Sequence, residues 1–224
     1  MADAGTTGPG NYEDYLEHCS QNKKIQQKAY LNLAYMGGVK QYGELTDLSL
    51  EDILSFMKKG DIFAHSFAAK SPGLLDKDGN VKEAVWQARQ RGVYFDLSHG
   101  KSNFSFAVAK KAVSQGFLPD AISTDLHEGS LKNVESLALT MSKMLACGLE
   151  LEKVLQLVTT EPVRMLQLSG KAVEIREGAR ADLTIFDVQE GQIELEDSDG
   201  ERLMGNKLIK PYCTILEQDI YPAW

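Results

Sequence analysis

The sequence lacks the features that mark membrane and secreted proteins. It has no apolar run of about 18 residues, so we expect no membrane-spanning helix. Residues 1–15, MADAGTTGPGNYEDY, contain neither a basic segment nor an apolar one, which argues against a signal peptide. The three cysteines, Cys19, Cys147 and Cys213, lie far apart and form no Cys-x-x-Cys pair. We therefore expect packed, free thiols without a zinc knuckle, in a cytoplasmic protein.

The sequence also has fewer basic residues than acidic ones. The chain has 24 Lys and Arg against 32 Asp and Glu, for a formal net charge of −8. Such a chain repels polyanions, so we predict neither nucleic acid nor an anionic membrane as a partner. A small-molecule ligand is expected instead, and the sequence leaves a homo-oligomer open.

Several catalytic motifs are missing from the sequence. There is no Gly-x-Ser-x-Gly, no Walker loop, no His-Glu-x-x-His and no Gly-x-Gly-x-x-Gly after a strand pattern. The stretch GTTGPG at residues 5–10 has the glycines of a phosphate loop but not its Lys-Ser/Thr ending. These absences argue against a nucleophilic serine hydrolase and a nucleotide-binding loop.

What the sequence does contain is three short apolar segments that each lead into a polar, ionisable residue. Helical patterns separate and follow them, the last of these over residues 133–147 before Glu150, with short connections, which predicts an α/β fold with parallel strands. In such folds the carboxyl ends of the strands carry ligands and catalytic groups. The segments are Asp61–Ala64 before His65, Val93–Leu97 before Ser98 and His99, and Ala121–Ser123 before Thr124 and Asp125.

The pattern changes after Gly170. From there to the end, short strand patterns alternate with turns, and no helical pattern follows. We therefore predict two domains, an α/β domain over residues 1–171 and a small β-sandwich-like module over residues 172–224.

Five residues at the predicted strand tips are candidates for chemistry. Asp125 suits a metal ligand and proton acceptor, or else a turn or N-cap aspartate. His65 suits a metal ligand or a packed histidine. His99 can be a ligand, a hydrogen-bond donor to a substrate or a loop residue, and Gly100 lets the backbone approach a ligand closely. His127 lies two residues past Asp125, close enough to line the same site at the strand ends.

Longer stretches around these residues resemble the amidohydrolase superfamily, in particular its dihydroorotase-like amidohydrolase/deacetylase metallohydrolases. The resemblance covers most of the chain. The matching stretches are ADAGTTG, GDIFAHSF, GLLDKDGNVKEAVWQARQRGVYFDLSHGKSNFSF, GFLPDAISTDLH, VTTEPVRMLQLSG and EGARADLTIFDV.

This resemblance implies a (β/α)8 barrel with one or two divalent metals, zinc above all, at its C-terminal mouth. The metals would activate a water for attack on an amide or cyclic-amide carbonyl of a small molecule. By position, His65 matches the family's sixth-strand histidine. Asp125 matches the eighth-strand aspartate, a metal ligand that also shuttles the proton. His99 matches the Asp-x-x-His-Gly motif that faces the site, with Gly100 and His127 as further substrate contacts.

The chain also departs from the family pattern. It contains no His-x-His, and the block expected to carry a carboxylated lysine and a fifth-strand histidine is missing between Leu48 and Leu50. A complete barrel takes about 250 residues, so we expect an incomplete TIM-type barrel plus the β module. The alternative is a catalytically inactive, truncated or internally deleted homologue that acts only as a binding or oligomerisation partner.

Overall fold

The computed structural model describes the chain in two compact units, Met1–Met57 and Lys58–Trp224, each of which is considered by itself. The predicted domain boundary at residues 171 and 172 lies outside the described residues and stays a prediction. The described residues are 2–7, 13–14, 17, 28–31, 49–70, 73–168 and 175–223.

The first unit contains a parallel strand pair and a helix. Strand β1 (Ala2–Thr7) pairs with β2 (Lys28–Leu31). Helix α2 (Leu50–Phe56) begins at a capping box, in which Ser49 Oγ accepts from Asp52 N at 3.1 Å and the Asp52 carboxylate accepts from Ser49 N at 3.0 Å. Such a box satisfies two backbone donors at the helix start.

The second unit begins with the parallel strands that the sequence predicts. Strand β3 (Ile62–Phe63) pairs in parallel with β4 (Tyr94–Phe95). The third predicted strand forms a single parallel bridge, between Asp96 and Ala121. The three segments therefore lie side by side, although their regular parts are shorter than expected. The fold class, α/β with parallel and antiparallel sheets, is confirmed, and the incomplete barrel stays a prediction.

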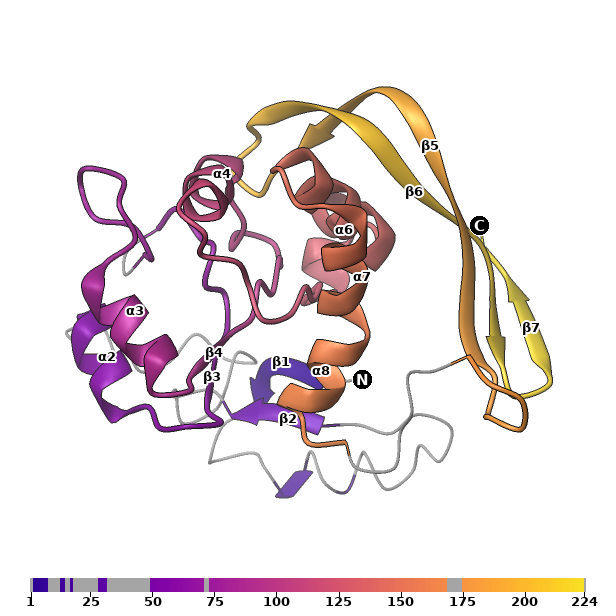
Figure 1. The fold of residues 1–224 in the computed structure, drawn as a ribbon, viewed down its shortest axis with the longest axis horizontal. Helices are drawn as coiled ribbons and strands as arrows, with labels where there is room; N and C mark the ends of the chain where they lie inside the picture. Colours follow the sequence, from indigo (N-terminus) through magenta and orange to yellow (C-terminus); the bar gives the residue numbers. More distant parts are fainter. Residues whose placement is uncertain are drawn as a thin grey trace. The chain divides into compact units, whose positions relative to one another are not determined.

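Helices separate and follow these strands (Figure 1). Three of them are followed by a glycine of positive φ, namely Gly92, Gly116 and Gly148, and the φ of 91° at Gly92 is a conformation that favours glycine. The helices of this unit are α3 (Glu83–Gln90), α4 (Phe106–Ser114), the 3-10 helix η2 (Glu128–Ser130), α5 (Leu131–Val134), α6 (Leu137–Ala146), α7 (Leu151–Val158) and α8 (Thr160–Met165).

An aromatic cluster forms the core directly beneath the strand tips. The ring of Phe117 meets Phe95 edge-on at 5.2 Å and Trp86 edge-on at 5.1 Å. The Arg89 guanidinium lies 3.8 Å from the Phe117 centroid and also donates to the Asp120 carboxylate at 3.0 Å. Each such aromatic pair contributes about 0.5–1.5 kcal/mol beyond its buried area, so the strands sit on a rigid base.

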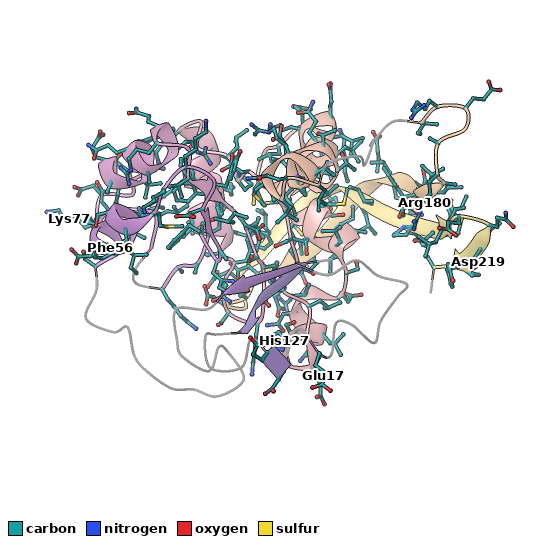
Figure 2. All side chains as sticks on the ribbon, turned by 90° about the horizontal axis from the view of Figure 1, so that it is seen from below. Glu17, Phe56, Lys77, His127, Arg180 and Asp219 are labelled. Atoms are coloured by element: carbon teal, nitrogen blue, oxygen red, sulfur yellow. The ribbon has the colours of Figure 1, made fainter. Side chains whose placement is uncertain are left out.

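The C-terminal residues form one antiparallel sheet, made of β5 (Asp182–Glu196), β6 (Arg202–Leu216) and β7 (Asp219–Pro222). The sequence pattern predicts several short strands here. The structure instead has two long ones, because register shifts after Ile185 and Glu190 absorb the breaks in the pattern as bulges. Figure 2 labels Arg180 and Asp219 at one end of this sheet.

The sheet is fastened to helix α6. Ile209 N, in β6, donates to Ser142 Oγ in α6 at 2.9 Å, and both residues are buried. Gly205 leaves room for the same helix, since a Cβ there would lie 3.4 Å from the Ala146 Cβ. The β module and the helices of the second unit therefore share a core.

The structure describes two of the three cysteines. Cys147 is a free, buried thiol, and burial raises its pKa to about 12, while Cys213 is free and partly exposed. Cys19 lies outside the described residues. Among the helices described, none is long and apolar enough to cross a bilayer.

Candidate functional site

Three strand tips share an uncommon backbone conformation. His65, Ser98 and Asp125 have φ values of 58°, 44° and 47°. Only a few per cent of non-glycine residues adopt positive φ, and such strain is concentrated at active sites and ligand clamps. All three residues follow the parallel segments, so the strain marks the same edge of the sheet that the sequence indicates.

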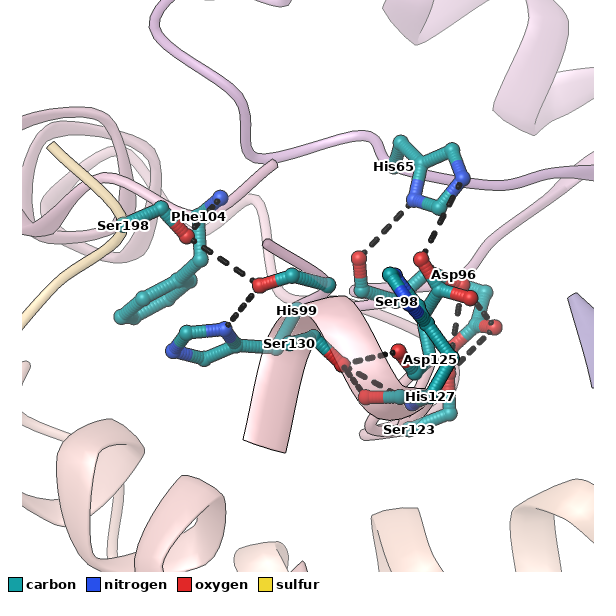
Figure 3. A network of polar contacts seen from close by, with 11 residues as sticks. His65, Asp96, Ser98, His99, Phe104, Ser123, Asp125, His127, Ser130 and Ser198 are labelled. Carbon is teal, nitrogen blue, oxygen red and sulfur yellow. Dashed lines mark hydrogen bonds and ion pairs between the residues drawn. The ribbon is translucent and has the colours of Figure 1, made fainter. Parts of the chain in front are cut away.

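The imidazole of His65 faces the carboxylate of Asp125 across this edge (Figure 3). His65 Nε2 lies 4.0 Å from Asp125 Oδ2, and His65 Nδ1 lies 2.9 Å from Ser98 O. A carbonyl only accepts, so Nδ1 carries the proton and a neutral His65 presents the Nε2 lone pair toward Asp125. Metal-bound histidines are held in this way, with the second ring nitrogen donating to a carbonyl or carboxylate.

The two side chains fit a metal ion as a pair but not as a complete site. Tetrahedral zinc holds its nitrogen and oxygen donors at about 2.0–2.2 Å, which places them roughly 3.4 Å apart. The observed 4.0 Å needs only a small closure. Catalytic zinc takes about three protein ligands. Among the described residues, however, no group of three His, Cys, Asp and Glu side chains is arranged to hold a metal.

Asp96 ties the strand tips together from below. Its carboxylate Oδ2 accepts from Ser98 Oγ and from Ser123 Oγ, each at 2.7 Å, and its carbonyl accepts from Ser66 Oγ at 2.8 Å. Burial raises the pKa of the Asp96 carboxyl, and the two hydroxyl donors oppose that rise. The network joins all three strand tips, since Ser66, Ser98 and Ser123 lie next to or near the site residues.

The role of Asp96 is a feature that the sequence interpretation missed. A carboxylate inside the otherwise apolar segment VYFDL was a usable signal, because a buried Asp needs dedicated partners.

Gly100 lies directly against Asp125. A Cβ at this position would come within 2.5 Å of Asp125 Oδ2 and 2.8 Å of Asn103 Nδ2, and the φ of Gly100 is 52°. Gly100 N donates to Thr124 O at 2.9 Å, which aligns the loop with the segment that ends in Asp125. The expectation that Gly100 permits a close backbone approach agrees with this geometry, although its partner here is Asp125.

His99 is buried completely, and both of its ring nitrogens have partners within the chain. Nδ1 lies 2.9 Å from Gly100 O, and Nε2 lies 2.9 Å from Lys143 Nζ. Its ring stacks on Phe104 with the centroids 4.8 Å apart. In this conformation a substrate would have to displace Lys143 to reach Nε2. The contact of His99 with a substrate stays a prediction.

His127 caps a short turn beside Asp125. Its Nδ1 accepts from Gly129 N at 3.1 Å, and its backbone N donates to Ser130 Oγ at 2.9 Å. Ser130 Oγ in turn donates to Asp125 O at 3.0 Å. The exposed His127 ring thus belongs to the turn that supports Asp125, and its contact with a substrate stays a prediction.

Comparison with known sequences points to one group of enzymes. Residues 175–222 match the family model of a deacetylase-like composite domain. The chain is 37% identical over 175 residues to a deacetylase of Enterococcus faecalis, which covers 77% of this chain and 47% of that protein. It is 35% identical to a deacetylase of Brucella anthropi, with 77% of this chain and 43% of that protein covered. The chain thus spans less than half the length of these curated relatives.

Solved structures share the fold over nearly the whole chain. A crystal structure of an adenine deaminase matches 99% of this chain and 77% of its own, with a TM-score of 0.85 and 28% identity. A dihydroorotase matches 99% of this chain and 75% of its own, with a TM-score of 0.82 and 25% identity. These comparisons confirm the resemblance seen in the sequence and do not favour the alternative of an inactive homologue.

Proposed function

Because the chain is a deacetylase-like member of the amidohydrolase superfamily, we propose that it serves metal-dependent hydrolysis of amide or cyclic-amide C–N bonds in small molecules. The observation that carries this proposal is the His65–Asp125 pair, 4.0 Å apart at the tips of the two parallel segments that flank the segment 93–97. The relatives named deacetylase support the choice of reaction.

His65 and Asp125 are proposed as two ligands of a divalent metal, zinc in the first instance. The described residues provide no third His, Cys, Asp or Glu ligand beside this pair. When bound, such an ion polarises a carbonyl and lowers the pKa of a water. The His65 Nδ1 bond to Ser98 O keeps Nε2 available for a metal.

Asp125 has a second proposed role, as the group that accepts the proton of the attacking water and returns it to the leaving nitrogen. Its position supports this role, because Gly100 and the Ser130 hydroxyl hold the residue from two sides. Gly100 and the exposed His127 are proposed to line the substrate side of the carboxylate. Cytoplasmic location and homo-oligomerisation stay predictions.

The test is a hydrolysis assay with N-acyl amides and cyclic amides in the presence of added zinc or manganese. Asp125→Asn is expected to lower turnover by about a hundred- to ten-thousand-fold, which is the usual contribution of a general acid–base group. Asp78→Asn is the matched control, because this substitution makes the same chemical change at an exposed loop position. Equal rates in both variants, or no hydrolysis by the wild-type chain, would contradict the proposal.

A further inference from the structure

The proposed chemistry gives no role to the most basic of the buried side chains that the structure describes, a lysine. Lys143, on helix α6, is only 1% exposed. Lysine is almost never fully buried unless it is paired, because removing its charge from water is costly. Its Nζ donates to Asn133 O at 2.7 Å and lies 2.9 Å from His99 Nε2.

These partners determine the protonation of His99. The Gly100 carbonyl only accepts, so its 2.9 Å contact with His99 Nδ1 is a hydrogen bond only in the tautomer that carries the proton on Nδ1. An ammonium only donates, so His99 Nε2 must offer its lone pair to Lys143. A protonated imidazole would place two donors face to face. Consistent with this, burial in the first place, and Lys143 in the second, lower the pKa of His99 to about 4.

Acidic groups around Lys143 preserve its charge. Burial lowers the pKa of Lys143 to about 8, and Asp197, Glu135 and Glu196 oppose that fall. Asp197 is itself buried, at the turn between β5 and β6, where its Oδ2 accepts from Phe106 N at 2.9 Å. Near neutral pH, Lys143 is therefore an ammonium.

The turn between β5 and β6 also supports the His99 ring, through the Phe104 side chain that stacks on the face of the imidazole. Phe104, which stacks on His99, donates from its backbone N to Ser198 Oγ at 3.2 Å and accepts at its carbonyl from Ser198 N at 3.0 Å. Figure 3 shows Ser198, Phe104 and His99 in this arrangement. The imidazole is held at one nitrogen and on one face by Gly100 and Phe104, which are close in the sequence, and at the other nitrogen by Lys143, 44 residues away.

The orientation of the His99 ring affects the position of Asp125 through Gly100, which lies between them. His99 N donates to Ser123 O at 3.1 Å, and the His99 ring bonds to the carbonyl of Gly100. Gly100 in turn lies against Asp125 Oδ2. A change in the tautomer or rotation of His99 removes one of the bonds that orient Gly100, whose N also donates to Thr124 O.

We propose that Lys143 is a positioning residue for this site: it fixes His99 as the Nδ1-protonated tautomer and so holds the Gly100 backbone against Asp125. The link to turnover rests on the proposed function, whereas the tautomer does not.

The first test is nitrogen-15 NMR of the histidine rings in the full chain, which has only four histidines. A His99→Gln variant assigns the signal. In the wild type, His99 is expected to be neutral and Nδ1-protonated at pH 7 and to titrate near pH 4. A wild-type His99 that is Nε2-protonated, or that titrates near its ordinary value, overturns the proposal without any variant.

Substitutions of Lys143 then separate the effect of its N–H donor from the effect of its positive charge. Lys143→Met removes the donor and its charge, so we expect an Nε2-protonated fraction to appear and the pKa of His99 to rise. Lys143→Gln keeps an N–H donor without the charge, so the Nδ1-protonated tautomer should be retained while the pKa rises. Lys77→Met is the control, because Lys77 extends from the surface (Figure 2). An unchanged tautomer in Lys143→Met contradicts the proposal.

Turnover provides the second readout. In a preparation that hydrolyses an amide, Lys143→Met should lower kcat by about ten- to a hundred-fold, the usual effect of losing a group that orients a site residue. Lys143→Gln should recover part of this loss, and KM should change little. A wild-type chain without hydrolysis but with the expected His99 tautomer rejects the proposed function alone, whereas normal kcat in Lys143→Met rejects the positioning role.

Discussion

The carboxylate of Asp125 occupies the space in which a Gly100 side chain would lie. A Cβ at Gly100 would meet Asp125 Oδ2 at 2.5 Å, closer than real Cβ atoms approach other atoms. Asp125 is thus set against the backbone of a neighbouring strand tip, and its position depends on the absence of one methyl group.

Gly100→Ala is expected to destabilise the fold and displace Asp125. The φ of 52° costs about 1 kcal/mol for a residue with a side chain, and the clash with Asp125 adds to that cost. Gly116→Ala is the control, because Gly116 has a φ of 79° but nothing within 4 Å of an added Cβ. Urea unfolding should show a larger loss for Gly100→Ala. Equal losses would mean that the contact with Asp125 is easily relieved.

Asp197→Ala is expected to lower the free energy of unfolding by about 2 kcal/mol. Ser105, the residue before helix α4, makes no side-chain capping bond. Asp197, which is 91 residues from Phe106, provides the cap instead, because its carboxylate accepts from Phe106 N. It also accepts from the backbone of its own turn, at Asp199 N and Glu201 N. Asp199→Ala, at an exposed position of the same turn, is the control in chemical denaturation. Similar stabilities of the two variants would show that α4 does not need this cap.

Stability is expected to depend on pH in two windows. The pKa of His99 is lowered from 6.5 to about 4, so the unfolded chain binds more protons there between these values. The free energy of unfolding therefore falls as pH decreases from 6.5 toward 4, by about 3 kcal/mol if the full shift applies. The pKa of Lys143 is lowered from 10.5 to about 8, so stability rises again between pH 8 and pH 10.5.

Urea unfolding at a series of pH values checks both windows. In Lys143→Met the rise between pH 8 and pH 10.5 should shrink, and the fall below pH 6.5 should be smaller. Other titrating groups affect the variant and the wild type alike, so the difference between the two curves is the relevant quantity. Superimposable curves would contradict the burial and pairing of Lys143 with His99.

The sequence predicts the local part of the site well. His65, Ser98 and Asp125 each follow an apolar segment, and the structure aligns those segments in parallel with all three residues at positive φ. This succeeds because strand pattern and chain order together determine which strand ends lie side by side.

Interactions between distant segments were not predictable in the same way. His99 meets Lys143 across 44 residues, and Phe106 meets Asp197 across 91 residues. Periodic patterns in a sequence report local secondary structure and do not indicate which distant residues contact each other. As a result, the sequence did not indicate that both ring nitrogens of His99 have partners within the chain.

Local breaks were missed for a different reason. The pattern over residues 133–147 predicts one helix, whereas the structure has α5 ending at Val134 and α6 starting at Leu137. Glu135 adopts a φ of 58°, and Ser136 Oγ accepts from Leu139 N to begin α6. Neither residue interrupts the apolar pattern, so only the cap chemistry of Ser136 signalled the break.

Metal content per chain tests the central claim most directly. It is measured by elemental mass spectrometry on protein purified without chelator. If His65 and Asp125 are ligands, zinc or manganese should be retained by the wild type and by Asp78→Asn, and lost from both His65→Ala and Asp125→Asn. A wild-type chain without metal, or equal metal content in all four proteins, would contradict the account.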